Sequence, residues 1–196
     1  MINNLKIKNI ISKMINKFSQ EENCKFLIKN HASEICICHH LAYYLYENLG
    51  GKWDVDIEYN LVSESSYSKY KCINENGRSF IRPDIIVHRR DRIDIDDNLL
   101  WCQAKRRNNP KGVEDDVGFM KHLTKRGCEV ICKEKGNVPN YQYGLFLVFD
   151  NRKDSSQLIH QLWFENGKPI SIDDFYESVD LRSMKKAVEE ALSGFS

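Results

Sequence analysis

The stretch "NLLWCQAKRRN", residues 98–108, is the most informative strand of the sequence, because its apolar residues run directly into an amide and three cations. Side chains alternate across a strand, so Trp101, Gln103 and Lys105 share one face. The residues of the other face are small or apolar and fit a hydrophobic core: Leu100, Cys102 and Ala104. The stretch predicts a core strand that carries an oxygen donor and a cation in the same direction near its end.

A second strand precedes it at "RPDIIVHRR", residues 82–90. A proline suits the first residue of a strand. The consecutive apolar residues at 85–87 predict a strand that is covered on both faces. If the two strands pair as a hairpin, Asp84 lies near Gln103 and Lys105.

The remaining pattern predicts helices and further strands around this pair. Apolar residues recur at helical spacing or alternate as in strands, and "NENG" and "ENGK" are turn sequences. We expect helices at 3–18, 33–49, 112–126 and 180–193, strands at 53–60 and 143–150, a hairpin at 70–81 and a late strand pair at 156–172. This order predicts an α/β (α+β) fold, a mixed sheet with helices on its faces.

The composition is that of one ordinary domain. The chain has 196 residues, of which 41% are hydrophobic and 29% are charged, and this is the globular range. The net charge of +1 gives no global attraction to nucleic acid, so any site for a polyanion must be a local patch. No apolar run approaches a membrane span, and the first 18 residues lack the apolar core of a signal peptide, so we expect a cytoplasmic protein.

The seven cysteines are then expected to be reduced thiols. The densest group of thiols and imidazoles is "CICHH", residues 36–40, and Cys24, Cys128 and Cys132 could in principle complete a zinc site. Zinc sites usually need two spaced ligand pairs, and the chain has no CxxC. Buried or incidental cysteines are therefore the favoured interpretation.

A carboxylate and a second oxygen donor at a sheet edge form a site that Mg²⁺ accepts. Mg²⁺ is usually bound through one or two carboxylates, together with waters and substrate phosphate oxygens. It lowers the pKa of a bound water and stabilises the charge that develops on a phosphate under attack. A neighbouring lysine can orient the water and offset that charge. Asp84, Gln103 and Lys105 therefore indicate metal-assisted hydrolysis of phosphodiesters.

Pro83-Asp84 followed by Gln103-Ala104-Lys105 resembles the motif of the PD-(D/E)xK nuclease superfamily, whose fold is that of many restriction endonucleases. The resemblance covers about residues 30–150, with "SEICICHHLAYYL", "WDVDIEYN" and "YGLFLVF" in matching places. It implies a restriction-endonuclease-like core of order α-β-β-β-α-β. The implied organisation is a single nuclease-like domain over 1–196, with additions at 3–18 and 156–194.

The resemblance implies a role for each matching residue. Asp84 would be the central metal ligand, Lys105 the catalytic lysine, and the backbone carbonyl of Ala104 a further ligand for Mg²⁺ or Mn²⁺. The family pattern has Asp or Glu where this chain has Gln103, which offers a carbonyl oxygen to the metal but removes one negative charge. A few active members of the superfamily carry glutamine at this place. The alternative is that Gln103 only satisfies a neighbouring strand.

Many members of the family place a further acid on the first core helix. Glu34, directly after a Ser33 cap, is expected to be this catalytic and metal-binding acid. Acids are also favoured in a first helical turn by the helix dipole, so Glu34 has a purely structural alternative. Glu58, on the polar face of the strand at 53–60, is the rival acid, and its own alternative is a surface position.

Cations near these residues are expected to contact the phosphates of DNA. The expected contacts are Arg106, Arg107, Lys111, Arg89 and Arg90. The alternative is a solvated strand end, which is the usual place of a run of charges.

These expectations combine into a metal-dependent DNA endonuclease that hydrolyses phosphodiester bonds through a Mg²⁺-activated water. DNA is the expected partner, and a homodimer or a partner protein would help to grip it because the overall charge is near zero. Two alternatives remain open. One is a catalytically weak or inactive nucleic-acid-binding module on the nuclease fold, and the other is a subunit of a defence or mobile-element complex.

Overall fold

The computed structural model describes residues 4–58, 82–90, 95–126, 130–132, 136–138, 140–152, 154–170, 172–178 and 182–193. The hairpin expected at 70–81 lies outside the described residues, as does Cys128 of the considered zinc site.

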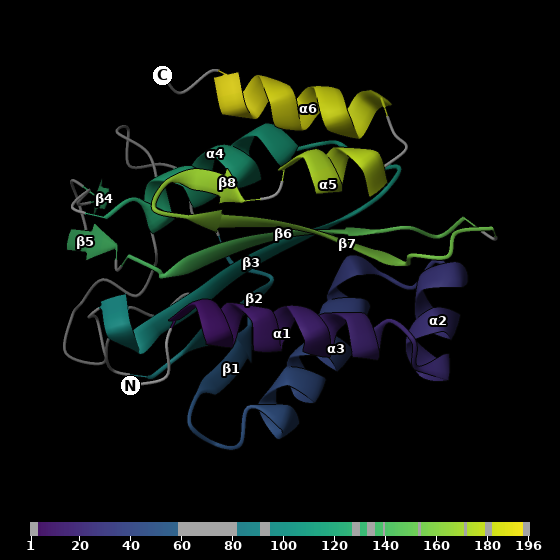
Figure 1. Ribbon diagram of the computed structural model, residues 1–196, viewed down its shortest axis with the longest axis horizontal. Helices are drawn as coiled ribbons and strands as arrows, with labels where there is room; N and C mark the ends of the chain where they lie inside the picture. Colours follow the sequence, from purple (N-terminus) through teal and green to yellow (C-terminus); the bar gives the residue numbers. More distant parts are fainter. Residues whose placement is uncertain are drawn as a thin grey trace.

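A six-stranded mixed sheet forms the centre of the structure (Figure 1). Its order is β1-β2-β3-β6-β7-β8, and β3 runs parallel to β6 while the other neighbours are antiparallel. These strands are β1 (Asp54–Ile57), β2 (Ile85–His88), β3 (Asn98–Arg106), β6 (Tyr143–Phe149), β7 (Ile159–Glu165) and β8 (Lys168–Ile170). A separate two-stranded pair is formed by β4 (Val130–Cys132) and β5 (Gly136–Val138).

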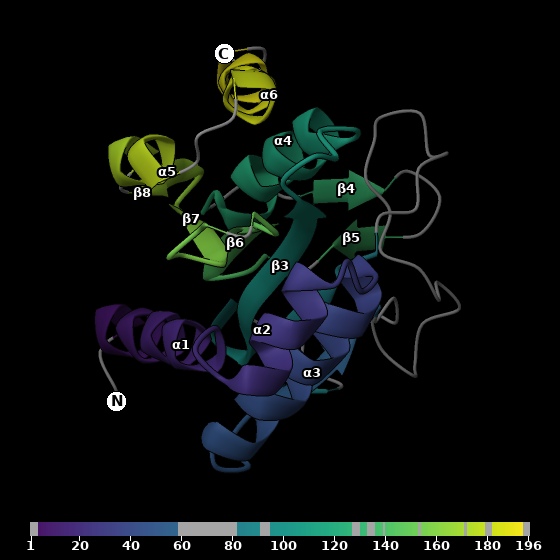
Figure 2. The same cartoon turned by 90° about the vertical axis from the view of Figure 1, so that its right-hand side faces the viewer.

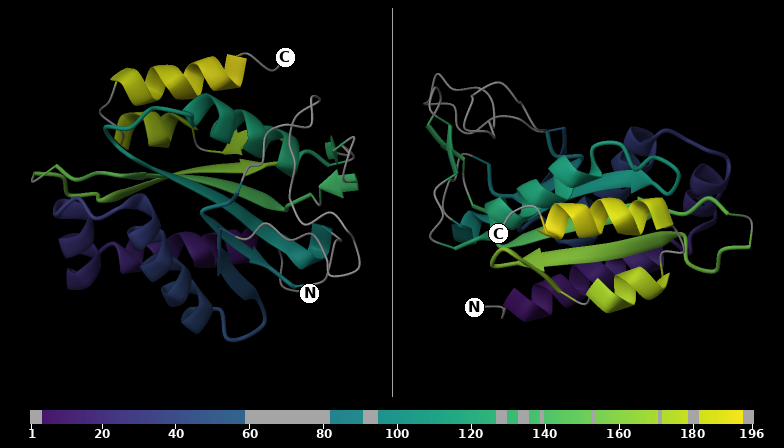
Figure 3. Two further views of the ribbon diagram at one scale, coloured as in Figure 1. Left: turned by 180° about the vertical axis from the view of Figure 1, so that it is seen from behind. Right: turned by 90° about the horizontal axis from the view of Figure 1, so that it is seen from above.

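Helices cover both faces of the sheet (Figure 1, Figure 2). One face carries α1 (Asn4–Phe18), α2 (Glu22–Lys29) and α3 (Glu34–Asn48), and the other carries α4 (Val113–Thr124), α5 (Ile172–Ser178) and α6 (Arg182–Ser193). α6 packs against α4 (Figure 3). The predicted class, a mixed sheet flanked by helices, is confirmed. In the described part of the chain, no helix has the length and apolar character needed to cross a membrane.

The four predicted helices are all present, with ends that differ by a few residues from those expected. α2 and α5 were not predicted, because helices of 8 and 7 residues span too few turns to show a clear period. The strand expected at 53–60 ends at Ile57, because Glu58 has a positive φ of 46° that an extended strand does not allow.

Each face of the sheet has its own hydrophobic core, because side chains alternate along the buried strands. Trp101 of β3 packs on the α4 side, where its ring meets Phe119 and Tyr141 at centroid distances of 5.1 and 5.4 Å. Leu100 and Cys102 of the same strand belong to the core on the α1 and α3 side. Burial of a large apolar side chain contributes roughly 2 kcal/mol, so these two cores hold β3 firmly between the helix layers.

β3 and β6 end at the same edge of the sheet, since they run parallel and Arg106 lies opposite Phe149. In open α/β sheets, ligands bind outside the carboxyl ends of parallel strands. The fold therefore brings the end of the "QAKRR" strand to an edge that is typical of binding sites.

The close approach of α4 to β6 gives a first testable prediction. A Cβ added to Gly144 of β6 would lie 3.1 Å from the Cβ of Met120 in α4, so the helix would have to shift. We expect Gly144→Ala to lower the free energy of unfolding by about 1–3 kcal/mol, measured by urea denaturation. An unchanged midpoint would show that α4 does not rest on this glycine.

Candidate active site

β2 and β3 separate at the start of β2, and we call residues 82–84 and 103–106 the β2–β3 fork. The last ladder contact before the fork pairs Ile85 with Cys102. The N–H of Asp84 still donates to the carbonyl of Cys102 at 3.0 Å. Beyond this point β3 continues to Arg106 while β2 has no further residues to pair with it. In a strand, alternate residues direct their N–H groups to the same side, so Ala104 and Arg106 follow Cys102 in facing the fork.

Two carboxylates accept hydrogen bonds from these two N–H groups. Oδ2 of Asp84 accepts the N–H of Ala104 at 2.7 Å, and Oε1 of Glu34 accepts the N–H of Arg106 at 2.8 Å. Oε1 of Glu34 also accepts a hydrogen bond from the side chain of Asn109 at 3.2 Å. Asp84 and Glu34 therefore meet on one strand although fifty residues separate them in the sequence.

The start of α3 places Glu34 at this position. Ser33 is the N-cap, and its hydroxyl accepts the N–H of Cys36 at 3.2 Å, which fixes where the helix begins. Glu34 is the first helical residue, and its carboxylate reaches the end of β3. The first-turn position that suits the helix dipole is thus also the position from which Glu34 reaches the fork.

The carbonyl of Ala104 faces the same gap. The N–H and C=O groups of one strand residue point to the same side, and the N–H of Ala104 points to Asp84. The carbonyl therefore lies on the fork side of β3, between the amides that Asp84 and Glu34 accept. The carboxylates of Asp84 and Glu34 and the carbonyl of Ala104 therefore lie on the same side of the end of β3.

Burial makes negative charge costly at Asp84. Burial of the side chain, together with the nearby charges of Asp116 and Glu34, raises the pKa of Asp84 to about 6. The hydrogen bond from Ala104 and the charge of Lys105 lower this pKa but do not restore its ordinary value. A positive charge beside Asp84 would relieve the cost, so the fork favours a cation.

Lys105 is held by an acid that the sequence interpretation missed. Its Nζ lies 3.0 Å from Oδ2 of Asp116, on the first turns of α4. Burial lowers the pKa of Lys105, but the charge and hydrogen bond of Asp116, together with the charges of Glu34 and Asp84, raise it above its ordinary value. The ammonium therefore stays protonated. Burial raises the pKa of Asp116, and Lys105 offsets only part of that effect.

A signal for Asp116 was present in the sequence. Val113, Val117 and Met120 form the buried face of α4, and Asp116 falls on that same face at helical spacing. A carboxylate on the apolar face of an amphipathic helix is unusual unless it is paired. Its pairing with a lysine 11 residues earlier required the crossover from β3 to α4, which no local pattern reveals.

Gln103 is buried and uses its amide nitrogen within the fork. Nε2 donates to the carbonyl of Arg82 at 3.0 Å and so ties the segment before β2 to β3. A glutamate could not make this bond, because an ionised carboxylate has no N–H to donate. The structure therefore gives Gln103 the strand-satisfying contact that was considered as its alternative role. Whether its carbonyl oxygen also binds a metal stays a prediction.

Glu58, the rival acid, has a different contact. Its carboxylate lies 3.6 Å from the guanidinium of Arg82, and 47% of its side chain is exposed. Glu34 instead reaches β3 directly and is among the charges that raise the pKa of Asp84. The geometry favours Glu34 over Glu58 as the second acid.

The expected phosphate contacts divide into two groups. Arg106 donates to the carbonyls of His31 and Ala32, so its guanidinium braces the start of α3. Nε of Arg107 lies 3.8 Å from the buried Asp150 at the end of β6. Lys111 is exposed in the connection from β3 to α4. These three lie at the carboxyl edge with Lys105.

Arg89 and Arg90 lie at the other end of β2, whose four residues separate them from Asp84. Arg89 lies five residues from Asp84, which is about 17 Å at the usual rise per residue. Arg89 pairs with Asp97 at 2.8 Å, and Arg90 pairs with Asp56 at 2.6 Å. Arg89 and Arg90 therefore form a group apart from the cations near the fork, and their contact with DNA phosphates stays a prediction.

The donors at the fork fit a hard divalent cation. Asp84, Glu34 and the carbonyl of Ala104 supply oxygen only, and Mg²⁺ prefers oxygen ligands with no more than one or two carboxylates. Within the described residues, no group of three or more His, Cys, Asp or Glu side chains is arranged to hold a metal. Burial raises the pKa of the neighbouring Cys38 and Cys102 thiols well above the usual value, which disfavours thiolate ligation.

Comparisons of this chain with protein-family models, with curated proteins and with solved structures gave no match.

The raised pKa of Asp84 predicts a stability gain on neutralisation. Between its ordinary pKa of 3.8 and about 6, the folded state binds the proton more tightly than the unfolded state, so the penalty grows as the pH rises through this window. We expect Asp84→Asn to raise the free energy of unfolding by about 1–3 kcal/mol at pH 8, with no gain at pH 3. Asp115→Asn, which neutralises an exposed carboxylate next to Asp116, is the control. A loss of stability in Asp84→Asn at pH 8 would contradict the electrostatic explanation.

Proposed function

We propose that this protein is a metal-dependent DNA endonuclease of the PD-(D/E)xK type, with its active site at the β2–β3 fork. The observation that carries the proposal is the convergence of two carboxylates on neighbouring amides of one strand, Asp84 on Ala104 and Glu34 on Arg106. Lys105 lies between these two amides in the chain. Two acids beside a lysine at the end of a central strand form the arrangement that the sequence resemblance implies.

The strand connectivity supports the same proposal. Along the chain, α3, β1, β2, β3, α4 and β6 come in the order of the implied α-β-β-β-α-β core, with the β4–β5 pair inserted between α4 and β6. In the sheet these strands are adjacent, with β3 and β6 as the parallel pair. A restriction-endonuclease-like core is our interpretation of this arrangement.

The residues of the fork have distinct proposed roles. Asp84 and Glu34 would hold Mg²⁺ or Mn²⁺ together with the carbonyl of Ala104. When bound, the metal would supply an activated water and stabilise the charge on the scissile phosphate. Gln103 would keep the Arg82 segment, and with it Asp84, in place through its bond to the Arg82 carbonyl.

Lys105 would act on the phosphate rather than on the metal. Asp116 keeps its ammonium protonated and fixes its position at 3.0 Å. A fixed positive charge next to the scissile phosphate stabilises the negative charge that develops during attack. Asp116 is therefore a positioning residue for Lys105.

DNA is the proposed substrate because several cations lie near the fork on a chain whose net charge is only +1. Arg107 and Lys111 lie at the carboxyl edge with Lys105, where backbone phosphates would be held. A homodimer or a partner protein, and a cytoplasmic location, remain part of this proposal.

A nucleic-acid-binding module without turnover is the second candidate. The observation that favours it is the use of the Gln103 amide in a structural bond, together with the absence of a negative charge at that position. In this case the phosphate contacts persist while metal binding is lost. A subunit that is active only within a defence or mobile-element complex would instead bind metal normally and fail to cut alone.

A cleavage assay separates these candidates. We expect the native protein to cut plasmid or linear DNA with Mg²⁺ or Mn²⁺, and Asp84→Ala and Lys105→Ala each to lower the rate by about 10²-fold or more. Lys125→Ala, which changes an exposed lysine just after α4, is the matched control and should retain the native rate.

The outcome of the same assay decides among the alternatives. Cutting that persists in Asp84→Ala would place the active site elsewhere. No cutting by the native protein but cutting by Gln103→Glu would identify a nuclease scaffold silenced by one amide. If no protein cuts and none binds metal, the binding module becomes the better description.

The two groups of arginines make a separate prediction for DNA affinity. We expect Arg107→Ala to weaken binding of a short duplex by about 3- to 10-fold at low salt and to reduce the salt dependence. Arg89→Ala should leave both unchanged, because Arg89 lies at the far end of β2 and pairs with Asp97. Equal losses in fluorescence anisotropy would refute the separation of the two groups.

A further inference from the structure

The outer edge of β7 is only half covered. β8 pairs with Trp163, Phe164 and Glu165 of β7. β8 then ends at Ile170, and the chain enters α5 at Ile172. Among the described residues, no strand lies beside the first half of β7 on this side of the sheet.

The backbone groups that face this open half are known from the strand pairing. The carbonyl of Leu158 accepts the N–H of Asp150, so even-numbered residues of β7 face β6. Ile159 and Gln161 therefore face outward, in line with Trp163 where it meets β8. The side chain of Gln157 donates to the carbonyl of Ile159 at 3.2 Å. This side-chain amide therefore takes the place of a backbone N–H that a neighbouring strand would donate to the same carbonyl.

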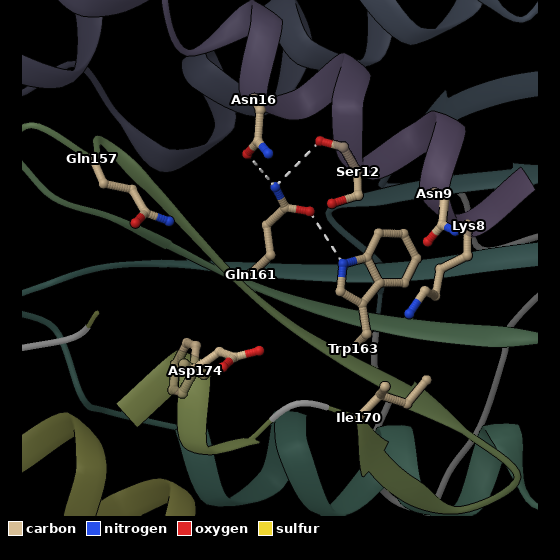
Figure 4. A pocket seen from close by; sticks show the side chains of 10 residues that line it. Lys8, Asn9, Ser12, Asn16, Gln157, Gln161, Trp163, Ile170 and Asp174 are labelled. Atoms are coloured by element: carbon tan, nitrogen blue, oxygen red, sulfur yellow. Dashed lines mark hydrogen bonds between the residues drawn. The ribbon is translucent and has the colours of Figure 1, made fainter. Parts of the chain in front are cut away.

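A cavity of about 360 Å³ lies at this edge (Figure 4). Its walls come from α1 on one face of the sheet, from β7 and the end of β8, and from α5 on the other face. The carboxamides of Asn9, Asn16, Gln157 and Gln161 contribute to the lining. The cavity therefore occupies the place that a longer β8 would take.

The side chain of Gln161 is already committed to the wall. Its Nε2 donates to Oδ1 of Asn16 at 2.7 Å and to the carbonyl of Ser12 at 3.4 Å, and its Oε1 accepts Nε1 of Trp163 at 3.1 Å (Figure 4). This network fixes α1 against β7. The side chain of Gln161 is thus held within the wall. A ligand at this position would therefore contact the outward-facing N–H and C=O groups of β7.

The two walls carry opposite charges. α1 contains four lysines and no acidic residue, and Lys8 lines the cavity. α5 begins with Asp173 and Asp174, both exposed, and Asp174 lines the cavity from the other side. Side chains of an added strand would alternate between these walls.

We propose that this edge binds an extended peptide segment of a partner protein, which adds to β7 as a further strand. Its backbone would pair with Ile159 and Gln161, and its side chains would be acidic toward α1 and basic toward α5. Strand addition of this kind takes its affinity from main-chain hydrogen bonds and its specificity from alternate side chains. The proposal is independent of the nuclease activity.

Two other occupants fit the edge less well. A nucleic acid would meet the lysines of α1 but cannot satisfy the alternating N–H and C=O groups of a strand edge. A second copy paired through the same edge would be related by a two-fold axis perpendicular to the sheet. That axis would place α1 beside its own copy and bring like charges together.

The test uses the full chain and a synthetic peptide, acetyl-Thr-Glu-Lys-Glu-Lys-Glu-Thr-amide, followed by NMR. We expect binding at millimolar concentration or tighter, with slowed hydrogen exchange at the amides of Ile159 and Gln161. Methylation of alternate peptide nitrogens should weaken binding by about tenfold or more. A peptide of the same composition with its Glu and Lys residues in blocks should also bind more weakly, because its charges no longer alternate.

A charge reversal in the protein provides the matched control. The single change Lys8→Glu alters a partly exposed residue and should leave folding and cleavage unchanged. It makes both walls acidic, so it should reduce affinity for the peptide whichever wall the glutamates of the peptide face. The proposal is overturned if the peptide does not bind at about 1 mM, or if methylation of its nitrogens leaves the affinity unchanged. It is also overturned if a single-stranded oligonucleotide binds at these residues instead. Protection of Ile159 and Gln161 that grows with protein concentration in the absence of peptide would point to self-association and would overturn it as well.

Discussion

The candidate site depends on two backbone N–H groups of β3. β3 continues beyond the last residue that pairs with β2, so these two N–H groups have no acceptor in the neighbouring strand. Buried N–H groups almost always find an acceptor, and here Ala104 and Arg106 find theirs in the carboxylates of Asp84 and Glu34. The strand that forms the centre of the core thereby also holds two acids close together. The cost is visible at Asp84, where burial and neighbouring acids raise the pKa to about 6.

The charges around the fork do not balance. Asp84, Glu34 and Asp116 influence one another through space, while Lys105 is engaged by Asp116 at 3.0 Å. A fold selected only for stability would place an apolar or neutral residue at Asp84. Partly buried carboxylates beside a backbone carbonyl oxygen are instead expected where a cation binds. This is the physical link between the geometry and the proposed nuclease activity.

Much of this arrangement could be predicted from the sequence, and the parts that could not share one reason. Alternation along β3 correctly placed Gln103 and Lys105 on the face of Trp101, and the helix cap at Ser33 correctly located Glu34. Asp116 was missed because its contact with Lys105 depends on how α4 crosses back over the sheet. The distance of Arg89 and Arg90 from the fork follows from the length of β2, whose ends the sequence does not mark. The bond from Gln103 to Arg82 depends on where the two strands separate, which no local pattern specifies.

Binding of Mn²⁺ to the native protein, followed by electron paramagnetic resonance, tests the central claim that the fork is a cation site. We expect a bound Mn²⁺ that Mg²⁺ displaces, with affinity reduced about tenfold or more in Glu34→Gln and in Asp84→Asn. Glu58→Gln should bind as the native protein does, since Glu58 pairs with Arg82 instead. A native protein that binds no Mn²⁺, or an affinity unchanged in both Glu34→Gln and Asp84→Asn, would contradict the account.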